Sequence, residues 1–105
     1  MNRRLQLLEK LVTEGSADPF HAYALALEYK RQQRFDQALA TFESLRTAHP
    51  GYLPMYMMAG QMLAALDRAA EATLWFEQGL GVARQQGDAK TTRELEDALR
   101  QTRGA

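Results

Sequence analysis

The stretch PFHAYALALEYKRQQRFDQALATFESLRTAHPGY, residues 19–52, decides the fold because its pattern of apolar and small side chains returns in the next segment. Shifting the sequence by 34 residues aligns it with LPMYMMAGQMLAALDRAAEATLWFEQGLGVARQQ, residues 53–86. The shift superposes side chains of like size, namely Ala38 on Ala72, Phe42 on Phe76, and Leu25-Ala26 on Ala59-Gly60. A period of this length indicates a repeat architecture, in which each copy is one supersecondary unit.

Each copy contains two runs whose apolar residues recur every three or four positions, which is the spacing of an amphipathic helix. In the first copy the runs are Ala22, Leu25, Ala26 and Tyr29, then Phe35, Ala38, Leu39, Phe42 and Leu45. In the second copy they predict a helix that ends at Leu66 and another with Ala69, Ala72, Phe76, Leu80 and Val82. Asp18-Pro19 is typical of a helix start and His49-Pro50-Gly51 of a stop.

The two copies resemble the tetratricopeptide repeat family, and the chain is similar to a small bacterial-type member with two full repeats and flanking helices. At the positions of the family pattern the first copy carries Ala22, Leu25, Ala26, Tyr29, Ala38, Phe42 and Pro50. The second copy carries at the same places Tyr56, Ala59, Gly60, Leu63, Ala72, Phe76 and Arg84. Departures from the pattern are Ala22, Ala59, Leu63 and Arg84. The resemblance implies an all-α fold, a right-handed α–α superhelix of about six antiparallel helices.

Flanking helices are expected at both ends, because a repeat cannot bury its hydrophobic face alone. The segment 1–17 carries the apolar stripe Leu5, Leu8, Leu11 and Val12, with Glu9 and Lys10 expected in water. Gly87 should end the second repeat, and 88–105 should form a capping helix with a seam of Leu95, Ala98 and Leu99. The prediction is therefore a single domain, 1–105, made of 1–17, repeats 19–52 and 53–86, and 88–105.

The resemblance also implies a concave groove lined by the first helix of each repeat. Its positions hold Phe20, Tyr23, Ala24, Leu27, Lys30 and Arg31 in the first copy, and Met57, Met58, Gln61, Ala64 and Ala65 in the second. We expect partner contacts at Phe20, Tyr23, Leu27, Lys30, Met57, Met58 and Gln61. An apolar surface of this kind commonly marks an interaction site, and methionine adapts to differently shaped partners. The simpler interpretation is that these side chains are core, or that the N-terminal helix covers them.

Two functions remain open. The first is a protein–protein interaction module, an adaptor or scaffold that binds a partner peptide or helix in this groove. The second is a self-assembling module whose groove forms a homodimer interface, because two repeats are fewer than the three that usually suffice. The family's carboxylate clamp is not expected, since Leu27 and Gln61 stand where it would need Asn.

Composition argues against several other classes of function. Thirteen basic and 13 acidic residues cancel, which removes the attraction to nucleic acid or anionic lipid. Without cysteine there is no thiolate site, and His21 and His49 lack metal-ligand spacing, so no metal or cofactor is expected. Gly79-Leu80-Gly81 lies within a predicted helix, which argues against a phosphate loop, and no enzyme activity is expected. We expect Trp75 to be partly buried in helix packing.

Residues 47–66 contain no Asp, Glu, Lys or Arg, and a stretch of this length could in principle span a membrane. Pro50, Gly51 and Pro54 interrupt it, so only about a dozen residues remain for a helix, too few for a membrane span. The N-terminal sequence carries Glu9 and Lys10 before any apolar stretch reaches the length of a signal peptide. The expectation is a cytoplasmic protein without a membrane partner.

Overall fold

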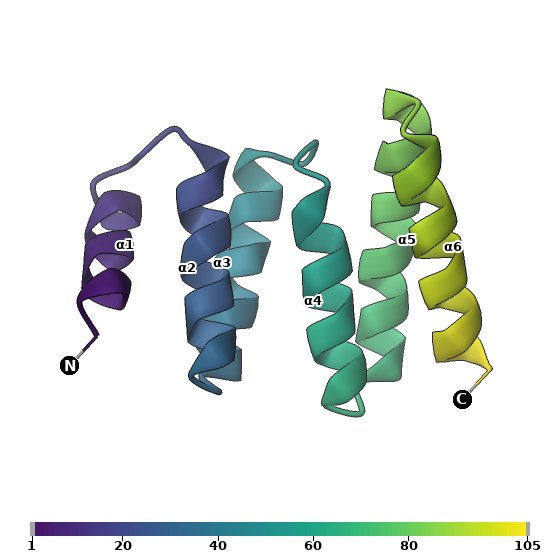
Figure 1. Ribbon diagram of the computed structural model, residues 1–105, viewed down its shortest axis with the longest axis horizontal. Helices are drawn as coiled ribbons and strands as arrows, with labels where there is room; N and C mark the ends of the chain where they lie inside the picture. The colour runs from purple at the N-terminus through teal and green to yellow at the C-terminus, as the bar shows by residue number, and fades with distance from the viewer. Residues whose placement is uncertain (1, 105) are drawn as a thin grey trace. The chain divides into compact units, whose positions relative to one another are not determined.

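The computed structural model describes residues 2–104 and consists, in that range, of six α-helices without a strand (Figure 1). The helices are α1 (Arg3–Thr13), α2 (Pro19–Arg31), α3 (Phe35–Ala48), α4 (Pro54–Ala65), α5 (Ala69–Gln86) and α6 (Ala89–Arg103). This confirms the predicted all-α helical repeat fold and the number of helices.

The chain divides into two compact units, Met1–Tyr52 and Leu53–Ala105. In unit 1, helix α2 packs against both α1 and α3, as Figure 1 shows. In unit 2, helix α5 packs against both α4 and α6. Each unit therefore contains one helical hairpin of the repeat and one flanking helix. The assignment of the chain to a single domain stays a prediction.

The turn inside each hairpin repeats the same backbone conformation 34 residues apart. Gln33 and Asp67 both adopt a left-handed conformation with φ of 61°. The next residue closes the turn in both copies, because the amide of Arg34 donates to Tyr29 O and that of Arg68 to Leu63 O, each at 2.9 Å. The repeat is thus present in the backbone, and it needs no glycine at the left-handed position.

Three polar side chains begin helices by accepting hydrogen bonds from backbone amides. Asp18 Oδ1 accepts from Phe20 N at 2.9 Å, and Asp88 Oδ1 accepts from Thr91 N at 2.9 Å. Asn2 Oδ1 does the same for Leu5 N at 3.0 Å. Gly87 ends α5 in the left-handed region with φ of 69°, which favours glycine. The predicted start at Asp18 and the predicted stop at Gly87 are confirmed.

Small residues allow the helices of unit 2 to approach closely. A Cβ atom added to Gly60 would collide with the ring of Phe76, which α5 presents to α4. Ala59 and Ala72 are fully buried, and their counterparts Leu25 and Ala38 in unit 1 are at most 5% exposed. Ala26, the counterpart of Gly60, is also fully buried. Trp75 is 4% exposed and its ring centroid lies 6.0 Å from that of Tyr56, so its predicted burial is confirmed.

Two expectations about solvent exposure were wrong. Glu9 is only half-exposed, because its Oε2 accepts a hydrogen bond from the Tyr29 hydroxyl at 2.5 Å across the α1–α2 contact. Ala24, expected in the groove, is 4% exposed, because the flank of α2 that carries it is covered. In both cases a neighbouring helix contact, which the sequence pattern does not show, lowers the exposure.

Candidate functional site

The four predicted site residues of unit 1 share one side of α2. Phe20, Tyr23, Leu27 and Lys30 follow one another at intervals of three or four residues, which places them in a single line along a helix. Phe20 is 52% exposed, and the other three are half-buried. Leu25 and Tyr29, two buried residues of the same helix, lie on the opposite side, whereas the buried Ala24 and Ala26 flank the line. We call the four residues the α2 stripe.

The start of the α2 stripe continues into a row of aromatic rings. The Phe20 and Tyr23 ring centroids lie 6.5 Å apart, and Tyr23 meets Tyr52 edge to face at 5.4 Å. Burial, and secondarily the neighbouring ring of Tyr52, raises the pKa of the Tyr23 hydroxyl. Burial likewise raises the pKa of Tyr52, with a smaller contribution from the Asp18 carboxylate. Both hydroxyls therefore stay neutral at physiological pH and can donate hydrogen bonds.

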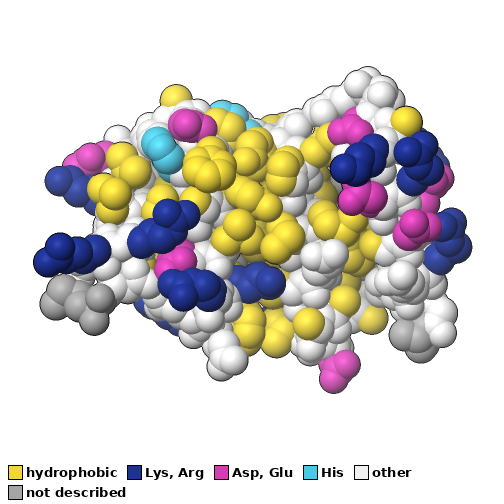
Figure 2. Space-filling view, in the orientation of Figure 1, with side chains coloured by type: hydrophobic (Ala, Val, Ile, Leu, Met, Phe, Trp, Pro, Cys, Tyr) yellow, Lys and Arg dark blue, Asp and Glu magenta, His cyan; other side chains and the backbone are white. Residues whose placement is uncertain are grey.

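Charge is distributed unevenly along α2. Asp18 precedes the helix, whereas Lys30 and Arg31 occupy its last turn, where cations interact favourably with the helix dipole. On the face shown in Figure 2, hydrophobic side chains gather over the start of α2 and Lys and Arg side chains over its end. Within residues 2–104, the Lys30 ammonium group forms no ion pair. The α2 stripe therefore has an aromatic end beside a carboxylate and a cationic end.

Sequence reasoning missed a buried carboxylate next to the α2 stripe. Glu28 is 5% exposed and accepts hydrogen bonds from Asn2 Nδ2 at 2.8 Å and from the guanidinium of Arg31. Arg4 Nε lies 3.9 Å from its Oε2. The hydrogen bonds from Arg31 and Asn2 lower the pKa of this carboxyl from 4.5 to about 2. A charged residue inside an apolar run was the available signal, and Arg31 follows on the same helix. The partners Asn2 and Arg4 come from the N-terminal segment and could not be inferred.

These contacts bear on the idea that α1 covers the site. The polar contacts of α1 reach Glu28 through Asn2 and Tyr29 through Glu9. Neither Glu28 nor Tyr29 belongs to the α2 stripe. Helix α1 therefore anchors on the flank and the opposite side of α2, and the half-exposed stripe residues keep their solvent contact.

The three predicted site residues of unit 2 lie on α4. Met57 and Met58 are half-buried, and Gln61, one turn later, is exposed. No residue of Pro54–Ala65 carries a charge, so the outer side of this helix is uncharged. We call these three residues the α4 face. Each set is compact within its own unit, and a groove that joins the two stays a prediction.

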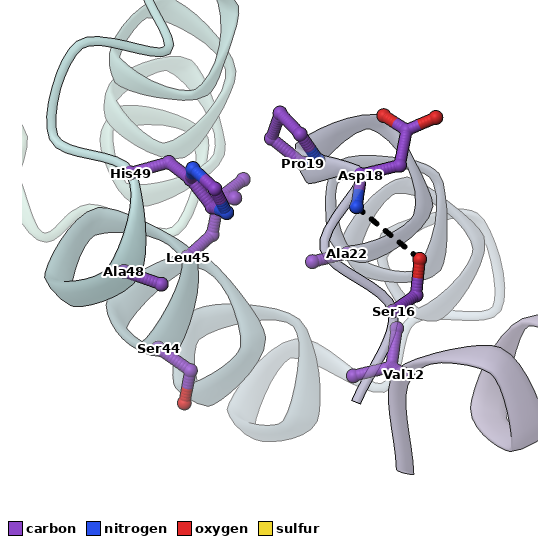
Figure 3. Close-up of a pocket in the computed structure, with 9 residues that line it drawn as sticks. All are labelled: Val12, Ser16, Asp18, Pro19, Ala22, Ser44, Leu45, Ala48 and His49. Atoms are coloured by element: carbon purple, nitrogen blue, oxygen red, sulfur yellow. Dashed lines mark hydrogen bonds between the residues drawn. The ribbon is translucent and has the colours of Figure 1, made fainter. Parts of the chain in front are cut away.

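Two hollows in unit 1 lie between the start of α2 and the end of α3. Figure 3 shows the first, of about 160 Å³, with Val12, Ser16, Pro19 and Ala22 on one side and Ser44, Leu45, Ala48 and His49 on the other. The Asp18 carboxylate points away from it. The second, of about 430 Å³, is lined by Pro19, Ala48, His49, Pro50, Gly51 and Tyr52. Residues from three segments form these hollows, so no local pattern could have predicted them.

A serine, a histidine and an aspartate meet beside the first hollow. Ser16 Oγ lies 2.6 Å from His21 Nδ1, but His21 Nε2 and Asp18 Oδ2 are 4.0 Å apart, too far for a hydrogen bond. Asp18 also caps α2, so its carboxylate does not orient the imidazole as a catalytic triad requires. Between Asn2 and Gly104, no three His, Asp or Glu side chains gather in a way that could hold a metal ion.

The comparison with solved structures places the fold among helical-repeat proteins. A tetratricopeptide repeat domain protein from Salinibacter ruber, solved in solution, is 39% identical, with a TM-score of 0.79 over 83% of this chain and 88% of that one. A crystal structure from the same organism shares 39% identity, covers 83% and 98%, and has a TM-score of 0.75. A Bordetella parapertussis protein is 25% identical over 97% and 89%, with a TM-score of 0.79.

At this identity and coverage, the chain belongs to the tetratricopeptide repeat family. No protein-family model and no curated protein sequence matches it. Membership supports a general role in protein–protein interaction, and members of the family are typically non-enzymatic scaffold modules. No helix among the described residues is both long and apolar enough to cross a membrane.

Proposed function

We propose that this protein is a non-enzymatic adaptor of the cytoplasm that binds a peptide or helix of a partner protein. The α2 stripe of unit 1 and the α4 face of unit 2 each provide contacts to the partner. The observation that carries this proposal is the α2 stripe: three apolar side chains remain solvent-accessible on the side of α2 opposite the buried Leu25 and Tyr29. Burial of such side chains against a partner supplies affinity, because removal of apolar surface from water is favourable.

A polar residue at the edge of each set favours one orientation of the bound partner. Lys30 attracts an acidic group at the end of α2, and Gln61 can both donate and accept hydrogen bonds beside Met57 and Met58. Charged and polar groups at the edge of an interface favour one orientation more than they add affinity.

The first experiment compares partner capture by matched variants. The full chain is immobilised, incubated with an extract of the native host, and the bound proteins are quantified by mass spectrometry. Tyr23→Ala and Met57→Glu should each abolish specific capture while circular dichroism shows a folded chain. Leu74→Ala is the control, because Leu74 is an exposed apolar residue of α5 outside the proposed surface. Capture that survives in folded Tyr23→Ala and Met57→Glu would contradict binding through these residues, and no specific capture by the parent chain would contradict the adaptor function.

A second candidate function is self-assembly through the same surface. The uncharged outer side of α4 favours it, because obligate dimer interfaces are more apolar than other surfaces. Light scattering over a wide concentration range distinguishes the two functions. A dimer that Met57→Glu dissociates would favour self-assembly, whereas a monomer at all concentrations leaves the surface available for a different protein.

A further inference from the structure

The geometry points to a binding site for a cationic side chain, Lys or Arg, of the partner segment at the start of α2, formed by Asp18 and the ring row Phe20, Tyr23 and Tyr52. This inference rests on the proposed function, because Phe20 and Tyr23 also belong to the α2 stripe. It adds the chemistry of one partner residue and the end of α2 at which that residue binds.

The ring row at the start of α2 presents aromatic faces that can attract a cation. Phe20, Tyr23 and Tyr52 form a continuous row, with centroid separations of 6.5 and 5.4 Å. Phe20 is the most exposed of the three at 52%. The π face of an aromatic ring attracts a cation, and the attraction grows when the cation loses water. Beside the row lies the hollow of about 430 Å³ to which Tyr52 contributes, so a long side chain has room to enter.

The charges near the start of α2 also favour a cation. The Asp18 carboxylate is 57% exposed and lies near enough to Tyr52 to raise the pKa of its hydroxyl. Helix α3 ends at Ala48, on the wall of the same hollow, and a helix C-terminus carries a partial negative charge. The N-terminus of α2 is partly positive, but Asp18 caps it and offsets that charge. The net field therefore favours a cation.

The opposite end of α2 carries positive charge. Lys30 and Arg31 lie about 18–20 Å from Asp18 along the helix axis, at about 1.5 Å per helical residue. They repel a cationic group there and attract an acidic one. A partner segment with a basic residue at one end and an acidic residue at the other therefore fits in one direction only, with the basic residue against the rings.

A pair of small probes tests the site in the full chain. The ¹⁵N-labelled protein is titrated with Nα-acetyl-lysine N-methylamide and, separately, with the uncharged Nα-acetyl-norleucine N-methylamide. The titrations are run at about pH 8, and His21, whose Nε2 lies 4.0 Å from Asp18 Oδ2, is followed in the same spectra. We expect saturable amide shifts at Phe20, Tyr23 and Tyr52 with the lysine probe, and about tenfold weaker binding of the norleucine probe. Trp75 in unit 2 should not shift.

Variants separate the contributions of charge and ring. Asp18→Asn should weaken the lysine probe about fivefold or more, because asparagine caps a helix as well as aspartate but carries no charge. Asp36→Asn removes an equal charge at the other end of α3 and should leave binding unchanged. Tyr52→Phe should retain binding, and Tyr52→Leu should lose it.

Three results would overturn the inference: no saturable shift, equal binding of both probes, or undiminished binding by Asp18→Asn. Partner capture distinguishes this failure from failure of the adaptor function. If capture still depends on Tyr23 and Met57 while the lysine probe does not bind, the partner uses the surface without a cation at the rings, and only this inference fails.

Discussion

The helices that flank the two repeats are attached by different kinds of contact. In unit 1, α1 buries Leu5 and Leu8 and also makes polar contacts with α2, from Asn2 to Glu28 and from Glu9 to Tyr29. In unit 2, α6 buries Leu95 and Leu99 against α5, while its ion pairs, Arg84–Glu96 and Glu77–Arg103, lie at the exposed rim.

The chain therefore covers the free side of each repeat hairpin by a different kind of contact. Docking of α6 depends on shape, because Leu95 Cδ1 approaches the surface that Gly79 leaves open. Docking of α1 depends partly on ionised and hydrogen-bonded groups, which respond to pH and to single-atom changes. The attachment of α1 is therefore the more adjustable of the two.

The largest expected effect comes from removing the apolar contact of α6. Leu95→Ala should lower the free energy of unfolding of unit 2 by about 2–5 kcal/mol, because Leu95 is fully buried and its loss leaves a cavity. Urea denaturation followed by Trp75 fluorescence measures the change. Leu74→Ala, at a position 58% exposed on α5, should change it by no more than about 0.5 kcal/mol. Equal effects of the two variants would show that α6 does not dock through a shaped apolar contact.

Two glycines of α5 give the next effect, with opposite signs. A Cβ at Gly79 would lie 2.5 Å from Tyr56 Cβ, so Gly79→Ala should destabilise unit 2 by about 1–3 kcal/mol. Gly81 has open space at that position, so Gly81→Ala should stabilise the helix by about 0.5–1 kcal/mol. Urea midpoints of both variants against the parent check the pair. Destabilisation by both would mean that backbone conformation, not the approach of Tyr56, requires these glycines.

A smaller effect is expected at the polar contact of α1. Tyr29→Phe removes the hydroxyl that donates to Glu9 and should destabilise α1 by about 0.5–1.5 kcal/mol. Hydrogen exchange of the α1 amides measures it locally. The control is Tyr23→Phe, because the Tyr23 hydroxyl makes no hydrogen bond within the described part of the chain. Unchanged exchange in Tyr29→Phe would indicate that Leu5 and Leu8 alone hold α1.

The last effect is present at neutral pH and is lost in acid. The pKa of Glu28 is about 2 in the folded chain, below its ordinary value of 4.5, so ionisation of this carboxyl favours the folded state. That contribution is complete above about pH 4.5 and disappears as the pH falls towards about 2. Thermal melts of the parent and of Glu28→Gln should therefore differ at neutral pH and converge in acid. A constant difference down to pH 2 would contradict the ionised hydrogen-bonded state of Glu28.

Local pattern was enough for the helices, the repeat and their ends. The 34-residue period, the spacing of apolar residues and the caps at Asp18 and Asp88 act within one or two turns of chain, so sequence alone reveals them. The side of α2 that carries the α2 stripe was predictable for the same reason, because helical spacing decides which residues share a face.

Contacts between distant segments needed the folded chain. Glu28 and Asn2 are 26 residues apart, Tyr29 and Glu9 are 20 apart, and the rings of Tyr23 and Tyr52 meet only when α2 and α3 are paired. No local propensity encodes these meetings, because they depend on how side chains from separate helices share the space left after the core is packed. The repeat pattern therefore specifies a scaffold, whereas its charged flank and aromatic row arise from tertiary packing.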